Sequence, residues 1–205
     1  IRYKGNDITL EHTQLNLRAF LNSDISVLLI DGAAGSGKSA LVKQLTNELT
    51  GDYEFLAFKS TDLDVNDILN FLTRYGELNL DEVIDVYKMA DTRVLYIDAA
   101  EKFFICEYQE TFEDILNRFM AAGWKIILTL RTAYRDPFQN SLLHGSKVQT
   151  YHVEPVDSDK LSTLSHTYGF QLPQDKRLLD LLYAPFYLGL YPVSYTHLRA
   201  HETLS

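Results

Sequence analysis

Several residue types are scarce in this chain, and each scarcity narrows the class of protein. Only one of the 205 residues is a cysteine, Cys106, so no disulfide can form within the chain and we expect a reducing, cytosolic setting. Lysine and arginine number 19 against 28 acidic residues, and the formal net charge of −9 argues weakly against nucleic acid or anionic lipid as a partner. No apolar run approaches the roughly 20 residues of a membrane span, and no signal peptide opens the sequence.

Both ends of the chain are unusual. The first residue is Ile1 rather than methionine, which indicates a fragment whose true beginning is missing. The stretch 192–205, PVSYTHLRAHETLS, follows an apolar helical pattern and has neither a helical nor a strand period. It resembles a translated sequencing-adapter read-through, so we predict a non-native tail that contributes nothing to the core; the alternative is a genuine polar terminus.

Five apolar stretches alternate with helical patterns along the rest of the chain. Buried strands are predicted at 25–31, 53–59, 93–98, 124–131 and 147–153. Helices are predicted at 9–23, 38–49, 65–75, 81–89, 108–122 and within 158–191. Strands that alternate with helices favour an α/β fold with a parallel sheet covered on both faces. Because only helical patterns follow the fifth strand, we expect a small helical lid there.

Small residues gather in one segment, DGAAGSGKSA at 31–40. Its spacing Gly32-x-x-x-x-Gly37-Lys38-Ser39 is that of a phosphate-binding P-loop, with a predicted strand before it and a predicted helix after it. Phosphate oxygens must approach several backbone N–H groups, and larger side chains would block that approach. Lys38 supplies a positive charge to the outer phosphates, and the Ser39 hydroxyl completes a magnesium shell. The predicted nucleotide-binding residues are Gly32, Ala33, Ala34, Gly35, Ser36, Gly37, Lys38, Ser39 and Ala40.

A second motif, VLYIDAAEK, supplies carboxylates. An apolar strand ends in Asp98, which is how a Walker B carboxylate is delivered beside Mg²⁺, so we predict Ser39 and Asp98 as the metal ligands. Glu101 lies three residues further on and is predicted to polarise the attacking water as a general base. The competing interpretation is that Glu101 is a helix-start residue that only favours the helix dipole.

A third motif, IILTLRTAYR, ends a buried strand in polar residues. Thr129 and Arg131 are both placed to sense a γ-phosphate, and we favour Arg131 in this catalytic role. The alternative is a capping or surface arginine. Arg135 is a poorer choice for the sensor because it is expected on the following loop.

These motifs together resemble the STAND class of P-loop NTPases, relatives of the NACHT and NB-ARC modules and of AAA+ proteins. GAAGSGKSAL, LYIDAAEK and WKIILTLR match in order and spacing, and LLYAPFYLGL resembles the helical-lid motif of that class. The resemblance implies a three-layer sandwich with a five-stranded parallel sheet in the order 5-1-4-3-2, counting strands along the chain. It also implies that Pro185 lies close to the adenine, and that Tyr3 to Asp7 are a worn version of the adenine-side loop.

The same resemblance implies a division of the chain and a function. An N-terminal adenine-side segment and helix would span 1–24, the P-loop NTPase core 25–154, a partial lid 155–191 and the tail 192–205. Members of the class bind ATP or ADP with Mg²⁺ between core and lid, act as signalling switches, and self-associate according to nucleotide state. Bacterial members often serve in defence against phage. The sensor and effector domains of such a protein are absent here, and Ala99 stands where many AAA+ ATPases have a glutamate, so we expect slow hydrolysis.

Two other functions are consistent with a P-loop. A helicase-like, nucleic-acid-dependent motor would need a groove with basic and stacking residues, against which the acidic balance argues. A nucleotide kinase would carry an arginine-rich lid, but the predicted lid holds only Arg177. Turnover stimulated by nucleic acid would indicate the motor, and transfer of phosphate to a nucleoside monophosphate would indicate the kinase.

Overall fold

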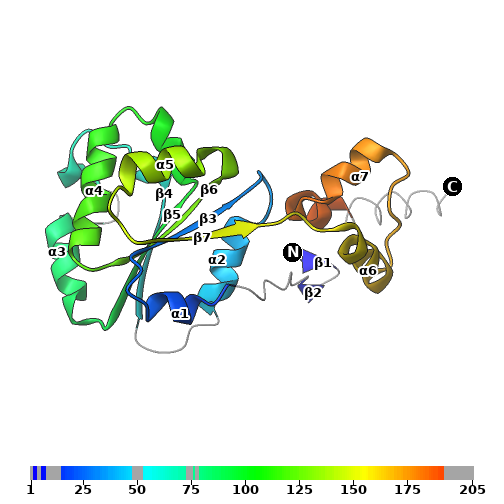
Figure 1. Cartoon of the computed structure of the whole chain (residues 1–205), viewed down its shortest axis with the longest axis horizontal. Coiled ribbons are helices and arrows are strands. Elements are labelled where there is room, and N and C mark those ends of the chain that lie inside the picture. Colours follow the sequence, from blue (N-terminus) through cyan, green and yellow to red (C-terminus); the bar gives the residue numbers. More distant parts are fainter. Residues whose placement is uncertain are drawn as a thin grey trace. The chain divides into compact units, whose positions relative to one another are not determined.

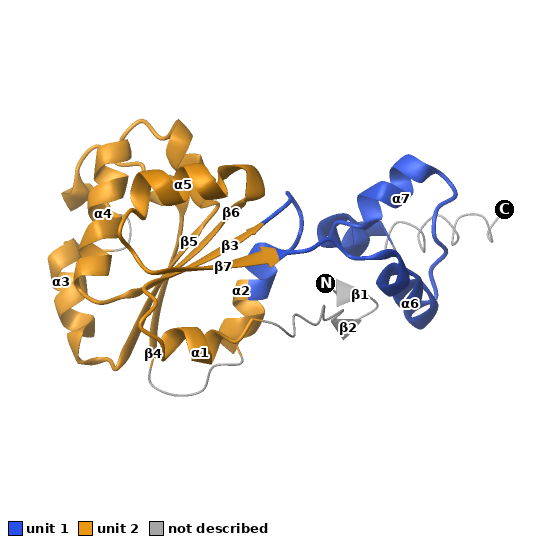
Figure 2. Ribbon diagram, in the orientation of Figure 1, with its two compact units in different colours: residues 1–13, 32–41, 153–205 blue, residues 14–31, 42–152 orange. Residues whose placement is uncertain are grey.

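The computed structural model describes residues 2–3, 6–7, 15–47, 53–72, 76 and 79–191. The predicted tail at 192–205 lies outside the described residues, as does Leu10 of the predicted N-terminal helix. The chain divides into two compact units, which Figure 2 colours separately. Unit 1 comprises residues 1–13, 32–41 and 153–205, and unit 2 comprises residues 14–31 and 42–152. The domain boundaries expected from the sequence stay a prediction.

A five-stranded sheet runs in the order β4-β5-β6-β3-β7 (Figure 1). The pairs β4–β5 and β5–β6 are parallel, with Lys59 opposite Asp98 and Ile97 opposite Leu128. The strands are β3 Val27–Gly32, β4 Tyr53–Lys59, β5 Thr92–Asp98, β6 Lys125–Arg131 and β7 Val148–Val153. Counted along the chain, this is the predicted order 5-1-4-3-2, and β6 lies between β3 and β5 as expected. The carboxyl ends of β3, β5 and β6 therefore meet at one edge of the sheet.

The central strands are buried on both faces, which explains their continuous apolar runs. One face belongs to the main core and includes Leu29, Ile97 and Leu128, which cluster with Phe112 and Phe119 of helix α4. Because side chains alternate along a strand, Ile30, Tyr96 and Thr129 point to the opposite face, and they are buried as well. The helices are α1 Leu17–Leu21, α2 Lys38–Asn47, α3 Leu80–Val86, α4 Gln109–Ala121 and α5 Arg135–Leu142.

Short 3₁₀ helices join several of these elements, and one of them corrects a prediction. They are η1 Ser60–Asp62, η2 Ile68–Asn70, η4 Tyr87–Met89, η5 Ala100–Ile105 and η6 Thr132–Tyr134. The helix predicted at 65–75 was wrong over its described part, 65–72, where the chain forms only the single turn η2. Asp67 accepts a hydrogen bond from the Leu69 N–H (2.9 Å), and such local side-chain bonds compete with an α-helix. The helix predicted at 81–89 is α3 followed by η4.

Unit 1 carries the helices predicted after the fifth strand. They are α6 Ser158–Tyr168, α7 Lys176–Leu182 and a further helical stretch at 185–191. Asp157 and Asp175 cap α6 and α7 by accepting from backbone N–H groups, as side chains at these positions commonly do. A small separate core holds this part together; its buried residues are Val156, Leu161, Phe170, Leu182 and Leu188.

The N-terminal residues of unit 1 form a short hairpin-like pair. Strands β1 Arg2–Tyr3 and β2 Asn6–Asp7 are antiparallel, with Arg2 opposite Asp7 and Tyr3 opposite Asn6. The predicted adenine-side loop spans these strands. Among the residues that the structure describes, no helix is long and apolar enough to cross a membrane.

Candidate functional site

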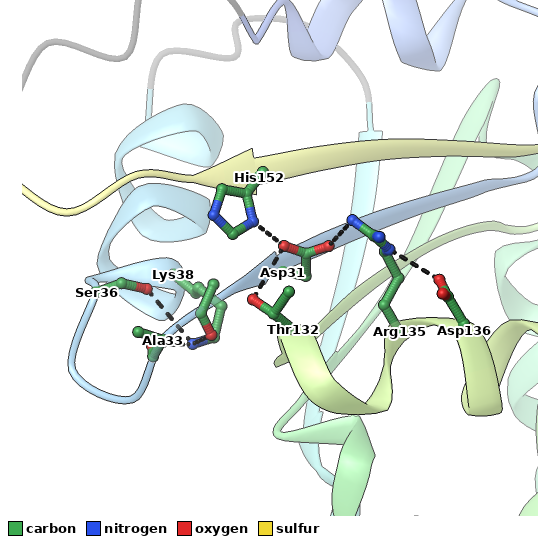
Figure 3. Close-up of polar contacts among 9 residues, drawn as sticks. Asp31, Ala33, Ser36, Lys38, Thr132, Arg135, Asp136 and His152 are labelled. Atoms are coloured by element: carbon green, nitrogen blue, oxygen red, sulfur yellow. Dashed lines mark hydrogen bonds and ion pairs between the residues drawn. The ribbon is translucent and has the colours of Figure 1, made fainter.

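The loop from Gly32 to Ser39 joins β3 to α2 and is folded around a lysine (Figure 3). The Lys38 ammonium donates to the carbonyl oxygens of Ala33 (2.8 Å) and Gly32 (3.0 Å), and lies 3.5 Å from the Ser36 hydroxyl. A positive charge is thereby held within the concave side of the loop. The structure thus gives the predicted segment the shape of a P-loop.

Two glycines of this loop are required by its geometry. A Cβ added to Gly32 would lie 2.8 Å from the Ser36 Oγ and 2.9 Å from the Val153 carbonyl oxygen, so any larger residue would displace backbone. Gly37 has a φ of +91°, a conformation that side chains disfavour. The P-loop spacing at these two positions therefore follows from steric demands of the loop itself.

Helix α2 begins immediately after the second of these glycines. Its first hydrogen bond runs from the Leu41 N–H to the Gly37 carbonyl oxygen (2.8 Å). The N–H groups of the turn ahead of this bond lie at the helix N-terminus, where the helix dipole is positive. Such a terminus is suited to an anion, and a phosphate is the usual occupant.

Pro185, predicted on the adenine side, lies against the P-loop within unit 1. It is buried and opens the helical stretch at 185–191, a position that suits proline. The Phe186 N–H donates to the Gly35 carbonyl oxygen (3.1 Å), and the Pro185 Cβ would be 3.7 Å from a Cβ at Gly37. The structure therefore brings the lid motif and the P-loop together. The contact of Pro185 with adenine stays a prediction.

In unit 2, Asp98 ends β5 in a network of hydroxyl groups. Its Oδ1 accepts hydrogen bonds from the hydroxyls of Thr129 (2.6 Å) and Tyr96 (2.8 Å). The Thr129 Oγ1 in turn accepts from the Ala99 N–H (3.1 Å), and Ala99 has a φ of +55°. This left-handed turn directs the chain away from the strand while the two hydroxyls fix the carboxylate. Sequence reasoning missed Tyr96, although its position two residues before Asp98 places both on one face of the strand.

Glu101 and Arg131 form an ion pair in unit 2. The Arg131 Nε lies 3.3 Å from the Glu101 Oε1; the Arg131 side chain is 60% exposed and that of Glu101 only 13%. The second carboxylate oxygen, Oε2, is buried and has no hydrogen-bond partner among the described residues. Burying a carboxylate oxygen without a hydrogen bond is costly, so this position is one that the fold has to support. The structure thus joins two residues that were predicted separately.

A third acidic group was not found from the sequence. Asp31, the residue before Gly32, is fully buried and accepts hydrogen bonds from Nδ1 of His152, the Thr132 hydroxyl (3.4 Å) and Nη1 of Arg135 (3.0 Å) (Figure 3). Arg135 is the first residue of α5, whereas the sequence suggested a loop. The neighbouring carboxylates raise the pKa of the Arg135 guanidinium, and the hydrogen bond to Asp136 has a larger effect than that to Asp31. No local pattern signals this cluster, because its partners lie more than 100 residues from Asp31 along the chain.

The predicted magnesium ligands have suitable chemistry. Ser39 offers a hydroxyl and Asp98 a carboxylate, and hard oxygen ligands are those that Mg²⁺ prefers. The Tyr96 and Thr129 hydroxyls are neutral donors that orient the Asp98 carboxylate. Among the described residues no group of three or more His, Cys, Asp or Glu side chains could hold a metal. A nucleotide-bound Mg²⁺ needs fewer, because water and phosphate complete its shell.

Comparison with known proteins gives likenesses in structure only. No protein-family model matches the chain, and no curated protein matches it. Among solved structures, the Hsp104–ADP complex of S. cerevisiae is similar with a TM-score of 0.59 and 15% identity over 87% of this chain and 29% of that one. The Orc1 protein of Aeropyrum pernix in complex with DNA is similar with a TM-score of 0.56 and 13% identity over 86% of this chain and 55% of that one.

A third likeness is to the Walker-type ATPase paby2304 of Pyrococcus abyssi, with a TM-score of 0.50 and 17% identity over 88% of this chain and 65% of that one. This chain spans less than two thirds of each of the three proteins. At such identities the likeness concerns the fold alone. The fold is that of P-loop NTPases, in agreement with the predicted sheet order.

Proposed function

We propose that this chain is the ATP-binding P-loop module of a STAND-type signalling switch that hydrolyses ATP slowly. The observation that carries the proposal is the loop at 32–39, which follows β3, encloses the Lys38 ammonium and opens α2. Its spacing, its glycine geometry and its lysine all serve the binding of a polyphosphate. The likeness to Hsp104 solved with ADP supports a nucleotide as the ligand.

Binding is assigned to the loop and to the end of β5. Backbone N–H groups at the start of α2 receive phosphate oxygens, and Lys38 exchanges its bonds to the Gly32 and Ala33 carbonyls for bonds to the outer phosphates. Ser39 and Asp98 hold Mg²⁺, which neutralises phosphate charge when bound. Tyr96 and Thr129 keep the Asp98 carboxylate in one orientation.

ATP hydrolysis is assigned to Glu101, the carboxylate three residues after Asp98. Ala99 has no group that could activate water, whereas Glu101 has a buried oxygen without a hydrogen-bond partner among the described residues. Glu101 therefore orients and deprotonates the attacking water. Arg131 holds the other oxygen of Glu101 and, on release, is available to the charge that develops on the γ-phosphate. A base that is engaged by its neighbouring cation is consistent with slow turnover.

The switch is assigned to the contact between the lid motif and the P-loop. The Phe186 N–H bond to Gly35 and the approach of Pro185 to Gly37 make the lid sensitive to what the loop binds. In the complete protein, exchange between ADP and ATP would control self-association and the missing sensor and effector domains. A cytoplasmic location and a role in bacterial defence belong to the same proposal and rest on the resemblance to the STAND class.

The first experiment is a titration of the full chain with MgATP, using wild type and Lys38→Ala. The substitution removes the charge that the loop encloses, and we expect ATP affinity to fall by about tenfold or more, since a charge-assisted bond contributes about 2 kcal/mol. A thermal melt of both proteins controls for folding. Equal titration curves would refute the P-loop assignment.

A nucleic-acid-dependent ATPase is the second candidate. It is favoured by the likeness to the Orc1 protein, which was solved in complex with DNA. Phosphate release should be measured with single-stranded DNA, with duplex DNA and with neither. A rise of about tenfold or more with either DNA would favour this candidate over the switch, and unchanged turnover would favour the switch.

A further inference from the structure

The residue before the P-loop is an unusual one for an anion site. Asp31 is fully buried and is joined by one peptide bond to Gly32, the first glycine of the loop. A carboxylate that loses its hydration must be paired, and an unbalanced negative charge next to a phosphate-binding loop would repel the ligand. The structure must therefore supply a counter-charge to Asp31.

Three side chains from separate elements meet at Asp31 (Figure 3). Thr132 lies on η6, Arg135 on α5 and His152 on β7. The Thr132 hydroxyl and His152 Nδ1 bond to Oδ1 of Asp31, and the Arg135 Nη1 bonds to its Oδ2. Only a carboxylate can accept all three donors at once. The cluster thereby ties the end of β3 to the end of β7 and to the start of α5. It fixes the point at which the P-loop begins.

Arg135 is the group that balances the charge. A guanidinium stays protonated at every physiological pH, so Arg135 always carries a positive charge. The Arg135 Nη1 lies 3.0 Å from Asp31 Oδ2, and its Nε lies 3.0 Å from Asp136, which holds the side chain in place. The pKa of Arg135 is raised by these two carboxylates.

We propose that Arg135 is a positioning residue of the nucleotide site, which acts through Asp31. By neutralising Asp31, it lets a buried carboxylate anchor the start of the P-loop without repelling the phosphates that the loop binds. The inference rests on the proposed function, because it requires a polyphosphate ligand. Arg131, the predicted sensor, is a different residue, since it pairs with Glu101.

The test compares the ATP affinity of the wild-type full chain with that of two variants. Arg135→Gln exposes the loop to an unbalanced carboxylate, and we expect MgATP affinity to fall about tenfold, the size of one partly screened charge–charge interaction. Adding Asp31→Asn to Arg135→Gln removes the carboxylate as well, and affinity should return to within about threefold of wild type. A purely structural role predicts the opposite, because the double variant loses more of the cluster than the single one.

Arg118→Gln is the matched control. Arg118 lies on α4 in the same unit, pairs with Asp81 and Asp114, and is 40% exposed against 36% for Arg135. The same loss of charge there should leave ATP affinity within about twofold of wild type, because a surface pair contributes little. An equal fall in Arg118→Gln and Arg135→Gln would overturn the proposal.

The remaining outcomes separate this inference from the proposed function. If wild type binds ATP and Lys38→Ala does not, but Arg135→Gln binds like wild type, the inference fails and the proposed function stands. If wild type itself binds no nucleotide, both fail. Should Arg135→Gln not fold, Asp31→Asn with Arg135 intact decides instead: affinity at or above that of wild type supports charge balance, and a tenfold fall overturns it.

Discussion

Asp31 and Asp98 occupy comparable places and have opposite surroundings. They lie at the carboxyl ends of β3 and β5, the two strands on either side of β6. Asp31 is fully buried and paired with the guanidinium of Arg135, whereas Asp98 is partly exposed and held by the hydroxyls of Tyr96 and Thr129. One carboxylate pairs with a cation of the protein, and two hydroxyl groups orient the other.

The difference shows that the groups bonded to an aspartate determine whether it serves the fold or binds a ligand. A carboxylate paired with arginine has its charge balanced inside the protein, so it can anchor three elements but has little attraction left for an outside cation. A carboxylate oriented by hydroxyls has a fixed direction, which is what a metal ligand needs.

The largest effect is expected when Asp31 loses its cation. Arg135→Ala leaves the fully buried Asp31 carboxylate without its guanidinium partner, and we expect a clear loss of stability. Urea unfolding followed by the fluorescence of the buried Trp124 measures the change. Arg118→Ala, which breaks two surface pairs, should cost less than about 1 kcal/mol. Equal losses in the two variants would show that Asp31 is not specially dependent on its partner.

The next largest effect concerns the carboxylate that follows Asp98. Glu101→Gln keeps the shape of the side chain and removes the base, so ATP should still bind while hydrolysis falls by roughly a hundredfold. Single-turnover phosphate release gives the rate, and titration gives the affinity. The exposed Arg131 loses only an ion pair with solvent access, so stability should change little. Wild-type hydrolysis in this variant would leave Glu101 as a helix-start residue and would require another activator of water.

Sequence reasoning anticipated these regions to different degrees. The five strands were predicted within two residues at each end, and the P-loop was predicted from its spacing. The sheet order came from resemblance to a family, because periodicity identifies strands but not their neighbours. The Asp31 cluster could not be predicted, since Arg135 and His152 reach it only through the fold. Over its described part, 65–72, the helix predicted at 65–75 was wrong, because the apolar spacing also suits an irregular segment that buries Phe71 and Leu72.

A smaller effect is expected when Asp98 itself is removed. Asp98→Ala should weaken MgATP binding by about tenfold, because one carboxylate ligand of the metal is lost. With EDTA in place of magnesium, the variant and wild type should bind ATP within about twofold of each other. Calorimetric titration under both conditions measures the two affinities. The same loss with EDTA as with magnesium would mean that Asp98 supports the fold of the site rather than the metal.

The smallest effect is expected at Tyr96, whose hydroxyl donates to Asp98 and lies 3.5 Å from the Thr129 hydroxyl. Tyr96→Phe keeps the buried ring, including its contact with Phe55, and removes one of the two hydroxyls that donate to Asp98 Oδ1. Thr129 still holds that oxygen at 2.6 Å, so the carboxylate loses only part of its orientation. We expect the affinity for Mn²⁺ with ATP, measured by electron paramagnetic resonance, to fall about threefold, which corresponds to about 0.7 kcal/mol.

Thr129→Val should have a larger effect, because it also deprives the Ala99 N–H of its acceptor. If Tyr96→Phe weakened metal binding as much as Asp98→Ala, the orientation of the Asp98 carboxylate, rather than its charge, would determine the affinity for the metal. The contrast with Asp31 would then lie in how firmly each carboxylate is held, because charge balance would no longer distinguish them.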